Sequence, residues 1–277
     1  MLQLTLGRRR SKSLILKKGL DFGTLWNKSF RFWKRRDKSP ELLKFTMPKY
    51  NFEFYCRINK DDFKVMTFHE DDILEHHFAP KEGDIVIDIG AHIGPYTIIA
   101  SKRVGPNGKV IAIEADPDNF DLLSRNIQLN KLSNVTALNY AACSKEKKIK
   151  LYLPSGVGRS SHTKYNTIMP NRAHGKEKFV EVKANTLDYL LQSNIIKQEE
   201  VNWIKIDVEG AEYEVLKGAK DILSKCSDIR LLIEIHNLSA GYNLYKPISE
   251  FLSLYNIKIE FEKASENGER HIIARKY

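Results

Sequence analysis

The stretch VIDIGAHIGPYT, residues 86–97, decides the fold of this chain. It begins as a continuous apolar run, typical of a strand that is buried on both faces. It then places an acid at Asp88 and turns at Gly90 and Gly94. Glycines at such a turn bring backbone amides to the start of a helix, which is how many α/β proteins hold a small polar ligand. The stretch therefore predicts a ligand-binding strand and turn, followed by a helix over residues 95–104.

Downstream of this unit, apolar runs and amphipathic segments alternate along the chain. Asp116 and Pro117 predict the N-cap and the first helical residue of a helix over residues 116–130. The segment EYEVLKGAKDIL predicts a single helix over residues 212–223. Continuous apolar strands that alternate with helices indicate a parallel sheet with helices on both faces. The predicted strands are 84–89, 109–115, 134–140, 201–208 and 229–235.

The C-terminal end of the chain follows a different pattern. The segments IKIEFEK and ERHIIARKY flank the turn ASENG at residues 264–268, and this arrangement predicts an antiparallel hairpin. We therefore expect an α/β fold. Its core would be a Rossmann-like, mostly parallel sheet of seven strands that ends in an antiparallel hairpin, with helices on both faces.

A long interruption separates the third and fourth of these sheet strands. Residues 147–153 and 178–185 are predicted to form two short strands, and residues 154–175 between them show no periodicity. A loop of this length is either a surface insertion or a lid over a site. Both interpretations stay open at this point. His162 and His174 within the stretch are interpreted as ordinary loop residues.

Composition limits the class of protein. A chain of 277 residues with 42% apolar residues can bury a full core, in one large domain or two small ones. No apolar run approaches the roughly 18–20 residues that a membrane span needs, and the N-terminus lacks the order of a secretory signal. Cys56, Cys143 and Cys226 are scattered, which favours a reducing, cytoplasmic setting over a disulfide framework.

Positive charge is concentrated at the N-terminus. Residues 1–50 hold 14 lysines and arginines against 3 acids, whereas the rest of the chain holds 31 against 32. We therefore divide the chain into a basic N-terminal extension, residues 1–50, and a domain, residues 51–277. The favoured interpretation of the extension is a solvated, partly helical arm that packs a few aromatic residues on the core. Contact with an anionic membrane surface is the second, and nucleic-acid binding the last. Its aromatic and basic residues include Trp26, Phe30, Arg31, Phe32, Trp33, Lys34, Arg35 and Arg36.

The turn after the first sheet strand indicates the kind of ligand. Its order is Asp88-x-Gly90-x-His92-x-Gly94, which differs from the G-x-G-x-x-G of dinucleotide enzymes. An acid at this place would repel a pyrophosphate and suits a ligand with an amino group or another cation. Glu114 ends the next strand, where a carboxylate accepts both hydroxyls of a ribose. Avoidance of anions together with capture of a ribose suggests S-adenosylmethionine. The predicted cofactor-binding residues are Asp88, Gly90, His92, Gly94, Glu114 and Asp207.

At this point the sequence resembles a known family. DIGAHIGPYT, IEADPDNFDLLSRNIQLN, NTLDYLL and above all IKIDVEGAEYEVLKG look like the FkbM family of S-adenosylmethionine-dependent methyltransferases. The resemblance covers residues from about 70 to 277. It implies the Rossmann-like fold of class I methyltransferases and O-methylation of a hydroxyl on a sugar, a lipid-linked glycan or another small metabolite. Two departures lie in the cofactor region: His92 stands where Asn is commoner, and Ala115-Asp116 replaces the usual Pro.

The candidate catalytic residues follow the fourth and fifth sheet strands. Asp207 lies at the end of one strand with Glu209 on the turn after it, and Glu234 and His236 end the next strand. Because neighbouring parallel strands end at the same edge of a sheet, we expect these groups, with Glu212, to converge. An alcohol is a poor nucleophile until its proton is removed, so a base or a metal is expected. We assign His236 as the base and no metal, although Asp207, Glu209 and Glu234 offer oxygen ligands for Mg²⁺.

Two other classes of function stay open on the sequence. The first is a nicotinamide-dependent oxidoreductase, against which the absence of G-x-G-x-x-G argues. The second is a binding module that keeps the cofactor fold without catalysis. Five titratable groups at two strand ends favour an enzyme over such a module.

Overall fold

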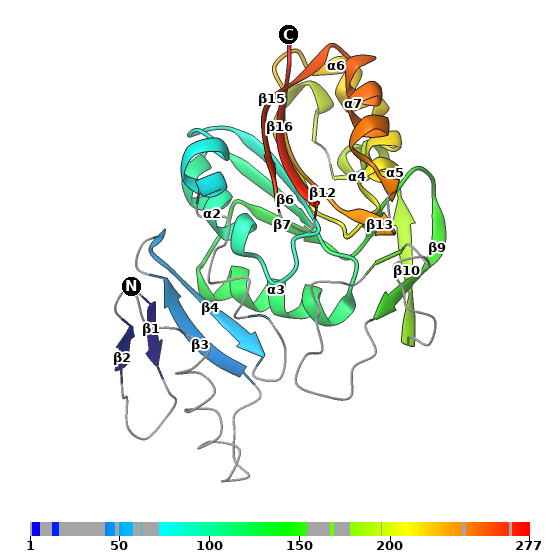
Figure 1. Cartoon of the computed structure of the whole chain (residues 1–277). Coiled ribbons are helices and arrows are strands. Elements are labelled where there is room, and N and C mark those ends of the chain that lie inside the picture. Colours follow the sequence, from blue (N-terminus) through cyan, green and yellow to red (C-terminus); the bar gives the residue numbers. More distant parts are fainter. Residues whose placement is uncertain are drawn as a thin grey trace.

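The computed structural model describes residues 2–5, 13–16, 42–47, 50–57, 62, 72–153, 167–168, 178–194, 196–239, 242–265 and 268–277. A seven-stranded sheet lies at its centre (Figure 1). Its strands, in spatial order, are β7 (Val135–Leu138), β6 (Lys109–Ile113), β5 (Ile85–Ile89), β11 (Val201–Ile206), β12 (Arg230–Ile235), β16 (Arg270–Lys276) and β15 (Ile257–Ala264).

The strand directions confirm the predicted architecture. Strands β7, β6, β5, β11 and β12 pair in parallel. Strand β16 pairs antiparallel with both β12 and β15, so the C-terminal hairpin forms as expected. The chain leaves β5 in the middle of the sheet and returns to the other side of β5 through β11. Ligands of open α/β sheets bind at such a reversal of strand order, beside the carboxyl ends of the strands.

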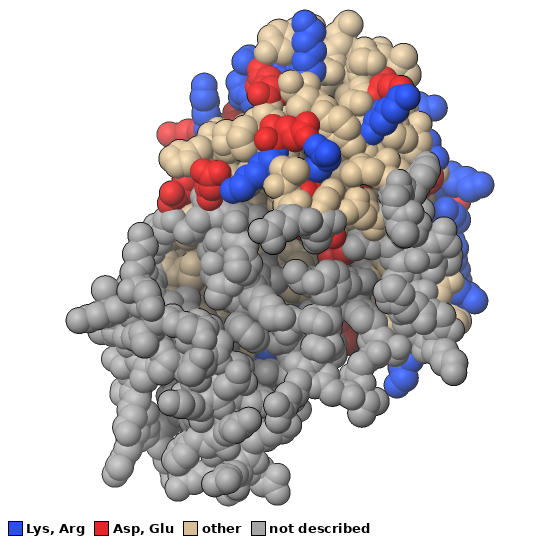
Figure 2. Space-filling view, viewed as in Figure 1, with Lys and Arg blue, Asp and Glu red and all other residues tan. Residues whose placement is uncertain are grey.

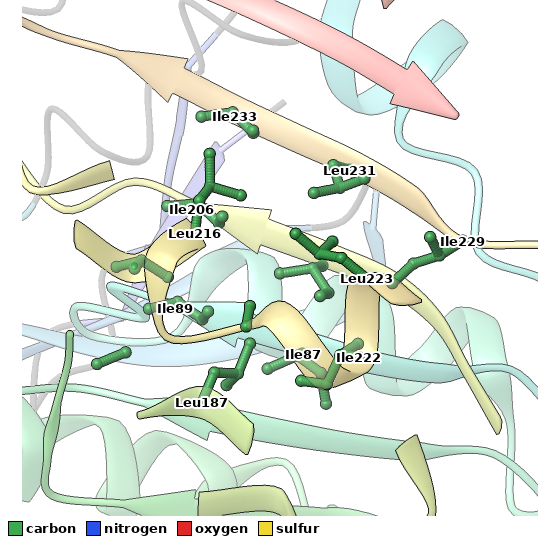
Figure 3. Close-up of a cluster of buried hydrophobic side chains, with 14 of the residues drawn as sticks. Ile87, Ile89, Leu187, Ile206, Leu216, Ile222, Leu223, Ile229, Leu231 and Ile233 are labelled. Carbon is green, nitrogen blue, oxygen red and sulfur yellow. The ribbon is translucent and has the colours of Figure 1, made fainter. Parts of the chain in front are cut away.

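One face of the sheet is covered by the C-terminal helices. Alternate residues of the central strands, such as Ile87 and Ile206, are fully buried against them. Figure 3 shows Leu216, Ile222 and Leu223 lying over these strands. The helices of this face are α4 (Leu187–Ser193), α5 (Glu212–Lys217), α6 (Lys220–Lys225) and α7 (Tyr245–Ser253).

The other face is covered by segments that come earlier in the chain. Val86, Val110 and Trp203 point to this side and are buried in a second cluster, which also includes Ile98 and Leu122. Asp116 caps the second helix, as predicted, by accepting hydrogen bonds from two backbone amides at its start. The segments that contribute to the second cluster are η3 (Ile73–His77), α2 (Pro95–Val104), α3 (Pro117–Leu129) and the hairpin of β3 (Leu42–Met47) and β4 (Phe52–Arg57).

The predicted single helix over residues 212–223 is wrong. The chain instead forms α5 and α6, which are separated at Gly218 and Ala219. A Cβ atom at Gly218 would lie 2.1 Å from the carbonyl oxygen of Cys143. The chain passes so close to this neighbouring backbone that only glycine fits, and the helix ends there. A helical period in the sequence carries no information on such a contact.

Shorter elements complete the described part of the chain. The two strands predicted around the interruption are present as β9 (Lys147–Leu153) and β10 (Lys178–Asn185), which pair antiparallel. Strand β10 also pairs in parallel with β8 (Ala141–Ala142). The remaining elements are η5 (Gln198–Glu200), β13 (Asn237–Ser239) and β14 (Tyr242–Asn243).

The N-terminal region contributes strands to the fold. Strands β1 (Leu2–Thr5) and β2 (Ser13–Leu16) join β3 and β4 in a four-stranded antiparallel sheet. The described residues of the predicted arm are thus strands rather than a partly helical extension. Phe45 in β3 is buried in the same cluster as Trp203, so packing of the domain begins before residue 51. The aromatic and basic stretch 26–36 lies outside the described residues.

The surface of the described part is mixed in charge. Figure 2 shows basic and acidic side chains interspersed over the described residues of one face. This agrees with the nearly balanced charge of the chain beyond residue 50. Within the described ranges, no helix has the length and the apolar character that crossing a membrane requires.

Candidate active site

The turn between β5 and α2 lies against the end of β11. Gly90 has a φ of +76°, and a Cβ atom there would lie 1.8 Å from the backbone oxygen of Asp207. Gly94 has a φ of +101°, and its Cβ atom would lie 2.7 Å from the side chain of Leu123. The sequence suggests that side chains at these glycines would fill the space of the cofactor. In the structure a side chain at Gly90 would meet backbone atoms of the protein itself, and the positive φ at both positions favours glycine in the turn.

Glu114 follows β6 and is held beside this turn. One of its carboxylate oxygens, Oε2, accepts a hydrogen bond of 2.8 Å from the backbone amide of His92. The other, Oε1, accepts one of 2.9 Å from the backbone amide of Asp116. Burial raises the pKa of Glu114 to about 7, against the two backbone hydrogen bonds, which lower it. The carboxylate has lone pairs left for further donors, as ribose binding requires.

Asp88 is buried at the end of β5 and paired with a lysine that the sequence analysis did not single out. Its Oδ2 accepts a hydrogen bond of 2.6 Å from the hydroxyl of Thr97, and its Oδ1 lies 3.4 Å from Nζ of Lys205. The same Nζ donates to the carbonyl oxygen of Gly90 at 3.0 Å and lies 3.3 Å from Oδ2 of Asp207. Lys205 therefore joins the ends of β5 and β11.

His92 adopts a left-handed conformation in the turn, with a φ of +53°. Its side chain points toward the carboxylate of Asp62, and the distance from Nε2 to Oδ1 is 3.8 Å. Burial lowers the pKa of His92 to about 4, although Asp62 acts in the opposite direction. His92 is therefore neutral at physiological pH. Its contact with Glu114 is made by the backbone amide.

The carboxylates predicted to converge with His236 do so. Nδ1 of His236 lies 2.8 Å from Oε1 of Glu212, and both side chains are buried. Nε2 of His236 faces three further carboxylates: Glu209 at 3.4 Å, Glu234 at 3.6 Å and Asp207 at 3.8 Å. These five residues, which we call the carboxylate–histidine cluster, come from the ends of β11 and β12 and from the start of α5.

The charges in this cluster act strongly on the histidine. Burial disfavours the imidazolium, but the fields of Glu209 and Glu212 and the hydrogen bond to Glu212 outweigh it. The pKa of His236 is therefore raised well above its ordinary value. For Asp207, burial would raise the pKa, but Lys205 and His236 lower it. Asp207 thus stays ionised, and about 29% of its side chain is exposed.

The cluster also contains donor atoms for a cation. One atom each of Asp207, Glu209 and His236 lie within 4.8 Å of one another. Two carboxylates and an imidazole at this spacing suit a divalent ion. The same three residues also suit base catalysis, in which the His236 imidazole takes up a proton. Metal catalysis and base catalysis are distinguished by a chelator, which stops only the first.

Several residues near these strand ends escaped the sequence analysis. Lys205 had a signal, because a lysine between Ile204 and Ile206 interrupts a buried apolar strand. Arg57 and Asp62, which contact α3 and the turn, had none. From the predicted interruption, Thr167 is described: its hydroxyl donates to the backbone oxygen of Glu209 at 2.7 Å. His162 and His174 lie outside the described residues.

The described residues fit the predicted cofactor. The buried carboxylate of Glu114 suits the two hydroxyls of a ribose, and the partly exposed carboxylate of Asp207 suits a positive charge. Both lie at the carboxyl edge of the sheet, on either side of Gly90. The donor chemistry at this edge is therefore that of a ligand with a sugar at one end and a cation at the other.

Comparisons with known proteins agree with this chemistry. The profile of the methyltransferase FkbM domain matches residues 88–258, more than half of the chain. The hexuronic acid methyltransferase AglP of Haloferax volcanii is 29% identical over 196 residues, covering 71% of this chain and 72% of that protein. Methyltransferase sdnD of Sordaria araneosa is 32% identical over 186 residues, covering 57% of this chain and 67% of that protein.

One solved structure is also similar to this chain. The FkbM methyltransferase of Methylobacillus flagellatus KT is 18% identical, with a TM-score of 0.49 over 75% of this chain and 46% of that one. The profile match and the order of strands in the sheet support the same conclusion. The chain belongs to the FkbM methyltransferase family, and its cofactor is S-adenosylmethionine.

Proposed function

We propose that this protein transfers the methyl group of S-adenosylmethionine to a hydroxyl oxygen of a sugar, a lipid-linked glycan or another small metabolite. The observation that carries the proposal is the buried pair of His236, after the end of β12, and Glu212, at the start of α5. Glu212 binds Nδ1 and fixes the orientation of the ring, so that Nε2 faces Asp207 at 3.8 Å. A carboxylate that orients a histidine is the arrangement of a general base.

The proposed cofactor site follows from the same strand ends. Glu114 would accept the ribose hydroxyls, and Asp207 would face the sulfonium and ammonium charges. The turn with Gly90, His92 and Gly94 would contribute backbone groups, while Asp88 and Lys205 hold the ends of β5 and β11 in place. When bound, the cofactor supplies an electrophilic methyl carbon.

The transfer is an in-line displacement on that carbon. A bond would form between the hydroxyl oxygen and the methyl carbon, and the carbon–sulfur bond would break with its electron pair left on sulfur. Nε2 of His236 would take the hydroxyl proton, while Glu212 stabilises the resulting imidazolium. Glu209 and Glu234 line the same space and would accept hydrogen bonds from the acceptor. Atoms and charges balance: a sulfonium and an alcohol give a thioether, an ether and a proton.

His236 must be neutral to act as a base, although the carboxylates favour its imidazolium form. A positive charge beside Asp207 would oppose the field of those carboxylates and lower the pKa of His236. Binding of the sulfonium would therefore shift His236 toward the neutral form, which is the form that acts as a base.

A sugar is the favoured acceptor. The relative from Haloferax volcanii is named a hexuronic acid methyltransferase. The cluster around His236 offers several carboxylate oxygens, and these are strong acceptors for the hydroxyls of a sugar. Of the two alternatives, a nicotinamide enzyme would place its pyrophosphate beside the carboxylate of Asp88. A binding module without catalysis would have no use for the oriented histidine.

The proposal is tested by methyl transfer from labelled S-adenosylmethionine to a cell extract fractionated into lipid, glycan and protein pools. We expect label in the glycan or lipid-linked glycan pool, in a linkage that resists alkali as an ether does. Label in the protein pool, or in an alkali-labile ester, would contradict O-methylation of a sugar hydroxyl. Repeating the assay with EDTA separates the mechanisms: base catalysis survives chelation, whereas a loss restored by Mg²⁺ would assign the carboxylates to a metal.

A further inference from the structure

Arg57, the last residue of β4, forms an ion pair with the buried carboxylate of Asp62 beside α3. Asp62 is fully buried, and its two oxygens accept Nε and Nη2 of Arg57 at 2.8 and 2.9 Å. Oδ2 of Asp62 also accepts a hydrogen bond from the backbone amide of Arg57 at 2.8 Å. Because two nitrogens of the planar guanidinium donate to one carboxylate, the guanidinium is held in a single orientation.

The guanidinium extends from this pair to the acid that we assign to the ribose. Nη2 of Arg57 donates to Oδ1 of Asn119 at 2.7 Å. The Nδ2 of that amide lies 3.5 Å from Oε1 of Glu114. Because Arg57 can only donate, it fixes which end of the Asn119 amide carries the oxygen. The NH₂ group of Asn119 must then face Glu114.

We propose that Asp62, Arg57 and Asn119 form a positioning relay for Glu114, so that the N-terminal hairpin completes the ribose end of the cofactor site. The proposal rests on the assignment of Glu114 to the ribose. In the relay, Asp62 orients Arg57, and Arg57 orients Asn119. Asn119 then presents a hydrogen-bond donor that favours the carboxylate form of Glu114 and fixes the direction of its lone pairs.

Docking of the hairpin does not depend on the relay. The side chain of Asn126 in α3 accepts a hydrogen bond from the backbone amide of Tyr55 at 2.6 Å and donates to the Tyr55 carbonyl at 3.2 Å. Asn130 accepts a hydrogen bond from the backbone amide of Glu53 at 3.0 Å. These amides hold β4 along α3. Burial of the Asp62 carboxylate is costly for a charged group, and Asn126 and Asn130 attach β4 to α3 without it.

The relay also reaches the other oxygen of Glu114. Oδ1 of Asp62 lies 3.8 Å from Nε2 of His92, whose backbone amide donates to Oε2 of Glu114. Both oxygens of the carboxylate are thus bound by residues whose side chains face the pair of Arg57 and Asp62. A change in this pair is expected to disturb the carboxylate from two sides.

A double-mutant cycle with S-adenosylhomocysteine as the probe tests the relay. The cycle compares Arg57→Leu, Glu114→Ala and the double variant by calorimetric titration of the full chain. We expect Arg57→Leu alone to weaken binding at least about fivefold. In the Glu114→Ala background, the same substitution should weaken binding less than about twofold, because the effects of coupled residues are not additive. Arg103→Leu is the matched control. Arg103 donates to the backbone oxygens of Leu74 and Phe78, away from Glu114, and its loss should leave affinity within about twofold.

The pH profile supplies a readout that a structural role would not change. Hydrogen bonds from Asn119 and from the amides of Asp116 and His92 lower the pKa of Glu114. Without Arg57, Asn119 is free to turn its oxygen toward Glu114. The pH below which affinity falls should therefore move upward in Arg57→Leu and return toward the original value in Arg57→Lys. Asp62→Asn, which keeps the shape of Asp62, should move it in the same direction by less.

The results of these experiments distinguish a failure of the relay from a failure of the ribose assignment. Equal fold losses from Arg57→Leu in both backgrounds would overturn the relay alone. A lower melting temperature with unchanged affinity and an unchanged pH profile would do the same, and Asp62→Asn provides this comparison if Arg57→Leu fails to fold. Glu114→Ala that binds the probe as tightly as the original chain would overturn the ribose assignment together with the relay.

Discussion

Glu114 and His236 are both buried at strand ends, but the surroundings act on them in different ways. For Glu114, burial is the largest influence and raises the pKa to about 7. For His236, burial would lower the pKa, and the carboxylates around it reverse this effect. Ligand hydroxyl groups that donate to Glu114 would favour its carboxylate, and a positive charge beside Asp207 would lower the pKa of His236.

The first prediction concerns the affinity for S-adenosylhomocysteine. Glu114→Ala should weaken binding at least about tenfold, because hydrogen bonds from two hydroxyls to a charged acceptor are lost. In the original chain, affinity should fall as the pH decreases from 8 to 6, since the protonated fraction of Glu114 rises through its pKa of about 7. Glu214→Gln, an acid paired with Lys217, serves as the control. Unchanged affinity in Glu114→Ala, measured by titration calorimetry, would exclude the ribose assignment.

The second prediction concerns proton release on binding. At alkaline pH, S-adenosylmethionine should release more protons than S-adenosylhomocysteine, because only the former carries a sulfonium charge. That charge lowers the pKa of His236 against the fields of Asp207, Glu209, Glu212 and Glu234. Protons released by Glu114 are common to both ligands and cancel in the comparison.

Calorimetry in buffers of different ionisation enthalpy, with EDTA present, measures the number of protons released. His236→Gln should abolish the difference between the two ligands. Equal proton release by both ligands in the original chain would show that His236 does not respond to the sulfonium.

At the scale of elements, strand β4 is attached to helix α3 through side-chain amides. Asn126 is fully buried and binds both backbone groups of Tyr55, and its Nδ2 also donates to the carbonyl oxygen of Ile93 at 2.8 Å. It therefore connects the hairpin, the helix and the glycine turn. In the sequence, an asparagine on a helix face looks the same whether it faces solvent or a strand. This role of Asn126 could therefore not be predicted.

The third prediction follows from these hydrogen bonds. Asn126→Ala should lower the free energy of unfolding by about 2–4 kcal/mol, because buried backbone groups of Tyr55 and Ile93 lose their partner. Gln128→Ala on the exposed side of the same helix should change it by less than about 0.5 kcal/mol. Denaturant unfolding monitored by circular dichroism provides the measurement. A loss no larger than that of Gln128→Ala would mean that water replaces Asn126 at little cost.

At the scale of the whole molecule, the sequence predicts the sheet and its strand ends well, because apolar period and turn chemistry are local properties. The helix over 95–104, the capped helix after Asp116 and the C-terminal hairpin all form. The convergence of Glu212, Glu234 and His236 follows from the neighbouring positions of β11 and β12.

Long-range contacts account for what the sequence does not predict. The break at Gly218 depends on the carbonyl oxygen of Cys143, and the relay through Arg57 joins segments 62 residues apart. The boundary at residue 51, which follows the charge distribution, stays a prediction, and Phe45 of the extension packs on the core. Membrane contact of the basic stretch 26–36 stays a prediction from its composition.

The central claim is that His236 is the base of a methyl transfer, and the single-turnover rate of His236→Gln tests it most directly. With the acceptor pool that the transfer assay identifies, we expect a rate roughly 10²–10⁴ lower and an affinity for S-adenosylhomocysteine unchanged within about twofold. The residual rate should rise with pH, because hydroxide replaces the missing base. A rate per folded molecule equal to that of the original chain, with only the melting temperature lowered, would contradict the claim and make the histidine structural.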